Sequence, residues 1–114
     1  MTFKKLIKDK LINVKDKYIL YKERRKFGFT HQDLWCLDQT IAKFVLPRLK
    51  AFRKVNYGYP SGMTKEEWDK KIDDMIFAMD YCLYMWNKEY NKKDQIRINK
   101  GMREFGKYFF HLWI

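Results

Sequence analysis

The sequence predicts an all-α protein, a small bundle of about four helices. Glycine and proline are scarce and gather in two places, around Gly28 and within residues 56–63. Between these breaks, apolar residues recur at intervals of three and four positions, which is the period of a helix face. No segment alternates apolar and polar residues in the way that a half-buried strand does. A chain of 114 residues is also of the right length for a single domain.

Residues 1–26 are predicted to form a basic amphipathic helix, followed by a bundle over residues 27–114. Ten Lys and Arg against three acids give the first segment a net charge of +7, out of +11 for the whole chain. Gly28 is a suitable stop for this helix. Its apolar face carries no Trp and only one Phe, so docking onto the bundle is favoured over lying along a membrane surface. The face consists of Phe3, Ile7, Leu11, Val14, Tyr18 and Tyr21.

The second helix is expected to start at Thr30, where Thr30 and Asp33 resemble a capping box. Pro47 lies inside its apolar pattern and lacks a backbone N–H, which predicts a kink or a break near residues 45–47. Asp38 falls at an inward position of this helix. A buried carboxylate needs a cation, so we expect a structural ion pair with an Arg; the alternative is an acid that orients an Arg toward a ligand.

Thr64 and Glu67 form a capping box that opens the third helix. Its stripe runs from Trp68 to Tyr90, and its second half is apolar on nearly all sides, as in the centre of a bundle or a subunit interface. The last helix is expected from about Asp94, with an apolar segment at 108–114 that must dock somewhere. The third helix and this segment together predict a homo-oligomer.

Cations beside aromatic rings mark the best candidate binding site. Arg is suited to phosphate and Tyr to stacking on a base, so the region after Pro47 favours a nucleotide or nucleic-acid ligand, with cations of the last helix joining it. A solvated basic face is the plain alternative. The candidate ligand-binding residues are Arg48, Arg53, Lys54, Tyr57, Tyr59, Arg103 and Lys107.

No pattern indicates catalysis, a metal or a cofactor. There is no Cys-x-x-Cys, and His31 and His111 stand far apart without an evident partner, so we expect no enzyme, no metal site and no cofactor. Two cysteines and no secretory signal indicate reduced thiols in a cytosolic setting. No apolar run approaches the roughly 18 residues that a membrane span requires.

Three stretches carry a resemblance to a family of small tailed-phage proteins. They are Leu34–Phe52 (LWCLDQTIAKFVLPRLKAF), Gly58–Trp68 (GYPSGMTKEEW) and Phe105–Trp113 (FGKYFFHLW), and the resemblance covers about residues 27–114. It implies a phage protein in the host cytoplasm and carries no catalytic residues with it.

Polarised positive charge predicts an anionic partner. The sequence therefore favours a small phage-encoded protein that binds a nucleotide or nucleic acid, with an accessory or anti-defence role. The alternative is a protein–protein interaction or assembly module whose aromatic helix faces bind a host or virion protein. Salt dependence separates the two, because phosphate binding weakens steeply with ionic strength.

Overall fold

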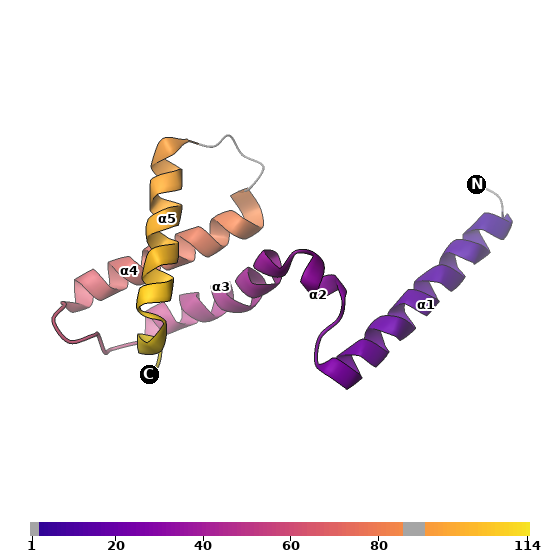
Figure 1. Cartoon of the computed structure of the whole chain (residues 1–114), viewed down its shortest axis with the longest axis horizontal. Helices are drawn as coiled ribbons and strands as arrows, with labels where there is room; N and C mark the ends of the chain where they lie inside the picture. Colours follow the sequence, from indigo (N-terminus) through magenta and orange to yellow (C-terminus); the bar gives the residue numbers. More distant parts are fainter. Residues whose placement is uncertain (1–2, 86–90) are drawn as a thin grey trace. The chain divides into compact units, whose positions relative to one another are not determined.

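The computed structural model describes the backbone of residues 3–85 and 91–114, and the side chains of residues 14–85 and 91–114. Within these ranges the chain forms helices, turns and loops and no strand, which confirms the all-α class (Figure 1). The chain divides into two compact units, Met1–Leu37 (unit 1) and Asp38–Ile114 (unit 2). The sequence analysis placed the boundary between the basic helix and the bundle at 26/27. That the whole chain is one domain stays a prediction.

Unit 1 contains α1 (Phe3–Phe27) and α2 (Gln32–Trp35). Gly28 follows α1 with a φ of 81°, and its N–H donates to the carbonyl of Arg24 at 2.9 Å. Glycine adopts this left-handed conformation without the strain that a Cβ brings, which confirms the predicted stop. The side chains of Phe3, Ile7 and Leu11, part of the predicted apolar face, lie outside the described residues.

The helix predicted from Thr30 onward is divided in two at Cys36. The N–H of Thr30 donates to Asp33 Oδ2 at 3.0 Å, which is half of the expected capping box. Cys36 then has φ −126° and ψ 67°, which is not helical, and α3 begins at Leu37. No Gly or Pro marks Cys36, so the sequence pattern gave no sign of this break.

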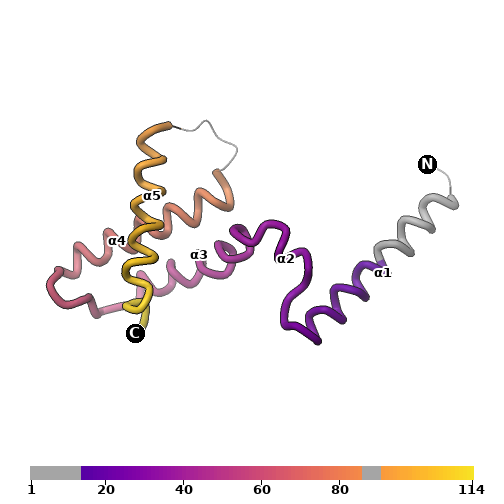
Figure 2. The backbone as a smooth tube through the Cα atoms, in the orientation of Figure 1, coloured from indigo at the N-terminus to yellow at the C-terminus, as the bar shows by residue number. Residues whose placement is uncertain are grey.

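Unit 2 is built from three long helices, α3 (Leu37–Val55), α4 (Lys65–Asp80) and α5 (Lys92–Lys107), which Figure 2 traces in order. Two short turns complete it, η1 (Tyr81–Met85) after α4 and η2 (Phe109–His111) after α5. The α3 helix continues through Pro47 without a break, and a kink there stays a prediction. Trp86 and Tyr90, the last residues of the predicted third stripe, lie outside the described residues.

Helix starts in unit 2 follow the capping signals of the sequence. Thr64 accepts a hydrogen bond from the N–H of Glu67 at 3.2 Å, and the Glu67 carboxylate accepts from the N–H of Thr64 at 3.4 Å. This reciprocal pair confirms the predicted capping box. Asn91 caps α5 by accepting from the N–H of Asp94 at 2.8 Å, so α5 begins at Lys92, slightly earlier than expected.

The hydrophobic core lies where α3 and α4 meet. Trp68, Ile72 and Met75 of α4 are almost completely excluded from solvent. Ala42, Leu46 and Leu49 of α3 are buried against them, with Met79 one turn further along α4. Half-buried residues of α5 and of the segment after it close this core: Phe105, Tyr108 and Leu112.

A glycine allows α5 to cross α4 at close range (Figure 1). A Cβ at Gly101 would overlap the backbone carbonyl of Asp74 and stand 3.1 Å from the Cβ of Ala78. Only a residue without a side chain fits here, so Gly101 marks a close approach of the two helices. Gly106, the other glycine of α5, has open space around it.

Two ion pairs of opposite polarity bridge the same crossing. Arg97 Nε of α5 lies 3.1 Å from Asp74 Oδ1 of α4, and Lys71 Nζ of α4 lies 3.4 Å from Glu104 Oε1 of α5. Both carboxylates are buried while both cations reach solvent. A buried acid without its cation is costly, so these pairs restrict how the two helices can slide past each other.

Gly101→Ala should destabilise the protein by about 1–3 kcal/mol, because the added methyl forces α4 and α5 apart. Gly106→Ala is the matched control, and we expect it to be neutral or to stabilise by up to about 1 kcal/mol, since alanine is the better helix former and space is open. Urea unfolding followed by circular dichroism measures both. Equal stability of the two variants would contradict the close crossing.

Candidate functional site

The predicted ligand-binding residues do not converge on one site. Arg53 joins α3 to α4 through two carboxylates: its Nε lies 3.0 Å from Asp73 Oδ1 and its Nη1 lies 3.3 Å from Asp69 Oδ2. The hydrogen bond to Asp73 raises the pKa of Arg53 above its usual value. Because its charge is already matched by two acids, Arg53 is a structural cation in this arrangement.

Arg48 lies beside an apolar groove. Its guanidinium stands 3.7 Å from the centre of the Phe44 ring and donates to the Phe44 carbonyl at 2.9 Å. The groove, of about 220 Å³, runs between α3 and the end of α5. Its lining is otherwise apolar: Phe44, Val45, Leu49, Phe52, Phe105, Phe109 and Leu112.

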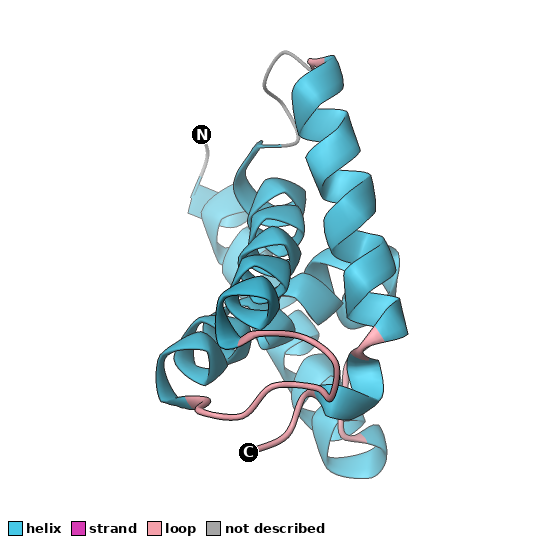
Figure 3. Ribbon diagram, turned by 90° about the vertical axis from the view of Figure 1, so that its left-hand side faces the viewer, coloured by secondary structure: helices cyan, strands magenta, loops and turns pink. Residues whose placement is uncertain are grey.

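Tyr57 and Tyr59 line a separate pocket of about 230 Å³. The loop that carries them and the segment after α5 lie side by side at one end of unit 2 (Figure 3). Trp68 of α4 contributes to the wall, and His111 and Trp113 complete the rings. Among the described residues, no Lys or Arg lines this pocket, so it lacks the predicted phosphate contacts from them.

The remaining predicted cations lie elsewhere. Arg103 lines a shallow hollow with Ile96 and Asn99 on α5. Lys107 stands over the ring of Tyr108, with its Nζ 5.3 Å from the ring centre, and Lys54 is exposed at the end of α3. The structure thus divides the predicted set among several surfaces of unit 2, and whether any of its members binds a ligand stays a prediction.

Asp38 corrects the sequence analysis. Its side chain is exposed, and none of the ion pairs found among the described residues includes it. The Cys82 thiol donates to Asp38 Oδ2 at 3.8 Å instead. The predicted inward position assumed one helix through residues 34–41, whereas the break at Cys36 shifts the helical phase and leaves Asp38 in the first turn of α3. An acid is favourable there because the helix N-terminus is partly positive.

The buried acids that the sequence analysis missed are Asp74 and Glu104. Each has one carboxylate oxygen without a hydrogen bond, Asp74 Oδ2 and Glu104 Oε2, although Lys100 Nζ stands 3.5 Å from the former. Asp73 and Asp74 are consecutive residues of α4. The side chain of Asp73 is half exposed, whereas that of Asp74 is buried. Gly101, a glycine within a helical pattern, was the sequence feature that could have indicated these buried acids. A close approach of two helices buries the side chains that flank the crossing point.

Unpaired positive charge is concentrated on α1. Among its described side chains, Lys15 to Phe27, no cation is ion-paired and none is buried. Unit 2 differs, because five of its fourteen described cations have an acidic partner within 4 Å. The paired cations of unit 2 are Arg53, Lys65, Lys71, Arg97 and Lys100. The net charge is therefore densest on α1: six cations and two acids give +4 over residues 14–27, whereas fourteen cations and nine acids give +5 over the 72 described residues of unit 2.

One of the two acids in the described part of α1 is already engaged. Glu23 accepts from the backbone N–H of His31 at 2.6 Å, and its other oxygen lies 2.8 Å from His31 Nδ1. The backbone hydrogen bond is the main reason that the pKa of Glu23 lies below its usual value. Glu23 therefore interacts with His31 in the turn after α1, and it forms no ion pair with a described cation of α1.

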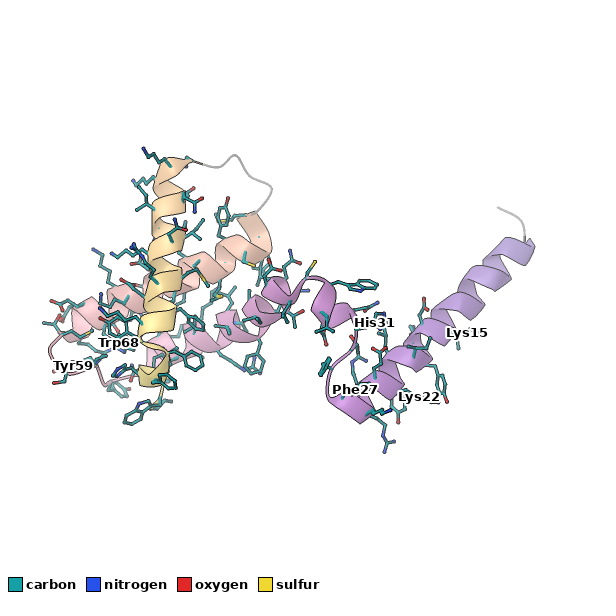
Figure 4. The ribbon with its side chains drawn as sticks, viewed as in Figure 1. Lys15, Lys22, Phe27, His31, Tyr59 and Trp68 are labelled. Carbon is teal, nitrogen blue, oxygen red and sulfur yellow. The ribbon has the colours of Figure 1, made fainter. Side chains whose placement is uncertain are left out.

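Rings are interleaved with the cations of α1. Lys22 Nζ stands 4.8 Å from the centre of the Tyr18 ring, and the guanidinium of Arg25 stands 5.9 Å from that of Tyr21. Figure 4 labels Lys15 and Lys22 on this helix. A helix that presents cations and tyrosines together offers groups for phosphates and for bases.

Comparisons with known proteins assign no family to this chain. Neither a protein-family model, nor a curated protein, nor a solved structure matches this chain. Within the described ranges, no group of three His, Cys, Asp or Glu residues is placed to hold a metal ion. The same ranges contain no helix that is both long and apolar enough to cross a membrane.

The thiol of Cys82 should react slowly, because burial, and then the charge of Asp38, raise its pKa above the usual value. At pH 8 we expect iodoacetamide to alkylate the exposed Cys36 first. Asp38→Asn should speed alkylation of Cys82 while leaving stability within about 0.5 kcal/mol. Mass spectrometry of the alkylated peptides measures both rates; a Cys82 rate unchanged by Asp38→Asn would contradict the contact.

Proposed function

We propose that this protein binds nucleic acid through α1. The observation that carries the proposal is the density of unpaired, exposed cations on this helix: six cations and two acids lie within residues 14–27, whereas the 72 described residues of unit 2 hold fourteen cations and nine acids. Uncompensated Lys and Arg attract a polyanion by releasing its counterions, a term that does not depend on sequence. No catalysis is assigned to the protein.

The spacing of the cations favours a polymer over a free nucleotide. Cations occur from Lys15 to Lys26, and at 1.5 Å per residue they extend over about 16 Å. Cations distributed over this length can contact several phosphates of a polymer, whereas the phosphates of one nucleotide are compact. The described cations of α1 are Lys15, Lys17, Lys22, Arg24, Arg25 and Lys26.

The same distribution argues against a membrane surface. Lys15, Lys22 and Lys26 follow one line along α1, while Lys17 and Arg24, seven residues apart, follow another. A helix that lies on a bilayer keeps its cations on one face and its apolar residues on the other. Cations on several sides suit a strand or a groove that surrounds the helix.

The proposal also includes the setting that the resemblance to small tailed-phage proteins implies. This is the cytoplasm of an infected host, where the protein would act as an accessory or anti-defence factor. Binding to nucleic acid is the part of the proposal that the structure supports, and it is tested without reference to that setting.

Changing Lys22, Arg24, Arg25 and Lys26 to Gln should weaken binding of a fluorescently labelled 20-nucleotide strand and flatten its salt dependence. If all four contact phosphates, the slope of log K against log salt should fall by up to about 3, at roughly 0.7 per contact. Anisotropy titrations between ~50 and ~200 mM salt measure this slope. Circular dichroism checks that α1 still forms.

The matched control removes the same charge from unit 2. Lys43, Lys50, Lys92 and Lys93 are exposed and take part in none of the ion pairs found among the described residues. Their change to Gln lowers the net charge equally and should leave the slope nearly unchanged. Equal losses from both quadruple variants would show that net charge alone is responsible and would overturn the assignment to α1.

A second proposal, self-association, is supported by the exposed rings of unit 2. Phe44 is 60% and Phe109 is 53% exposed, and both line the apolar groove beside Arg48. In η1, Tyr84 is 67% exposed, whereas the other described apolar residues of the second half of the predicted third helix are buried or half-buried. Exposed apolar surface of this extent is typical of an interface, and we propose a second copy of this chain as its partner.

Phe44→Glu should shift the protein from oligomer to monomer, because a carboxylate in an apolar interface is costly to desolvate. Ile96→Glu is the control: Ile96 is 59% exposed on α5 but does not line the groove. Size-exclusion chromatography with light scattering at micromolar concentration measures the mass. A wild-type monomer of 14.2 kDa would refute self-association.

A further inference from the structure

The pocket between the 56–60 loop and the segment after α5 has the character of a small-molecule site. Five rings contribute to its lining, and no charged Lys, Arg, Asp or Glu does. Its volume of about 230 Å³ is below the range of roughly 300–1,000 Å³ that holds drug-sized ligands. The pocket therefore suits one flat ring system. The rings belong to Tyr57, Tyr59, Trp68, His111 and Trp113.

Tyr59 on the loop and Trp68 on α4 are labelled in Figure 4. Trp68 is 1% exposed, and its ring is fixed by an edge-on contact with Tyr108 at 5.7 Å between centres. Tyr57 is 86% and Trp113 is 72% exposed. A rigid inner wall with open rings at its rim can receive a planar ligand and cover it.

Asn56 supplies the polar group of the pocket. Its residue is 5% exposed, and its side-chain Oδ1 already accepts from the N–H of Gly58 at 3.1 Å. The amide nitrogen Nδ2 donates to no described residue, and it is not among the buried atoms that lack a partner, so its N–H groups are open to solvent or to a ligand. A donor left open at the lining of an aromatic pocket suits a ligand that carries an acceptor.

We infer that this pocket binds a nucleobase that carries an exocyclic carbonyl, taken from a single strand. Rings stack on a base, the Asn56 amide donates to its carbonyl oxygen, and the uncharged lining leaves the phosphates outside. Adenine has no carbonyl oxygen, and its bidentate contact with Asn requires Oδ1 to accept a second hydrogen bond beside the one from Gly58, so we expect adenine to bind more weakly.

Other ligands fit the pocket less well. A methylammonium group stacks on rings, but the N–H groups of Asn56 present their positive ends to it. A proline-rich peptide needs an extended groove along several residues, whereas this pocket holds one ring system. The inference rests on the proposed function in one respect, that the base belongs to a nucleic acid; it adds that the nucleic acid is single-stranded.

Uridine tests the pocket without phosphates. Isothermal titration of the full chain with uridine should show binding that is nearly independent of salt, with adenosine at least fivefold weaker. Tyr57→Ala and Trp113→Ala should each weaken uridine binding at least tenfold, within the range expected for loss of one stacking ring. Trp35→Ala is the matched control, since this ring is exposed and does not line the pocket.

The outcomes separate this inference from the proposed function. The quadruple Gln variant of α1 should keep uridine binding while losing affinity for the strand. Failure of uridine to bind, or equal effects of Trp113→Ala and Trp35→Ala, would overturn the pocket assignment and leave the binding of nucleic acid by α1 standing. Binding of a proline decapeptide in place of uridine would overturn it in favour of a peptide groove. Uridine binding with no strand binding would support the pocket and refute the role of α1.

Discussion

The packing of unit 2 depends on how closely α5 can approach α4, and Gly101 sets that distance. Without a side chain at this position, the backbone of α5 rests on the carbonyl of Asp74 and the methyl of Ala78. The close crossing brings Asp74 and Glu104 out of solvent, so each carboxylate must be met by a cation from the opposite helix. It also allows Phe105, Tyr108 and Leu112 to close the core over Trp68. One absent methyl group thus determines the charge pattern and the apolar packing together.

Local signals in the sequence predicted local structure well. The stop at Gly28 and the capping box at Thr64 are confirmed, because each depends only on hydrogen bonds within a few residues. The all-α class is confirmed for the same reason, since helix periodicity is a short-range property. The break at Cys36 was missed because that residue is neither Gly nor Pro, and a single non-helical φ/ψ pair leaves no mark on composition.

Local signals could not predict which side chains pair with each other across the helices. Asp38 and Asp74 are both helical acids with an apolar and a polar residue as neighbours in sequence, yet only Asp74 is buried. The difference arises from the phase of α3 after the break and from the crossing at Gly101, both of which are three-dimensional. Arg53 is a similar case: its neighbours in sequence are basic and aromatic, whereas its neighbours in space are Asp69 and Asp73. Charge pairing across helices therefore decided which predicted cations remain unmatched.

The buried apolar residues of the described chain all lie between Ala42 and Met79, within unit 2. Packing restricts such positions in size and shape, since a change of one methylene is felt in a close-packed core. The described side chains of α1 meet no such restriction and are defined mainly by their charge. Evolutionary drift should consequently be uneven: homologues can exchange Lys for Arg and move their positions along α1, while α3, α4 and Gly101 keep their identities. In alignments of such homologues, sequence similarity over α1 should become undetectable long before similarity over unit 2 does, even where both parts keep their function.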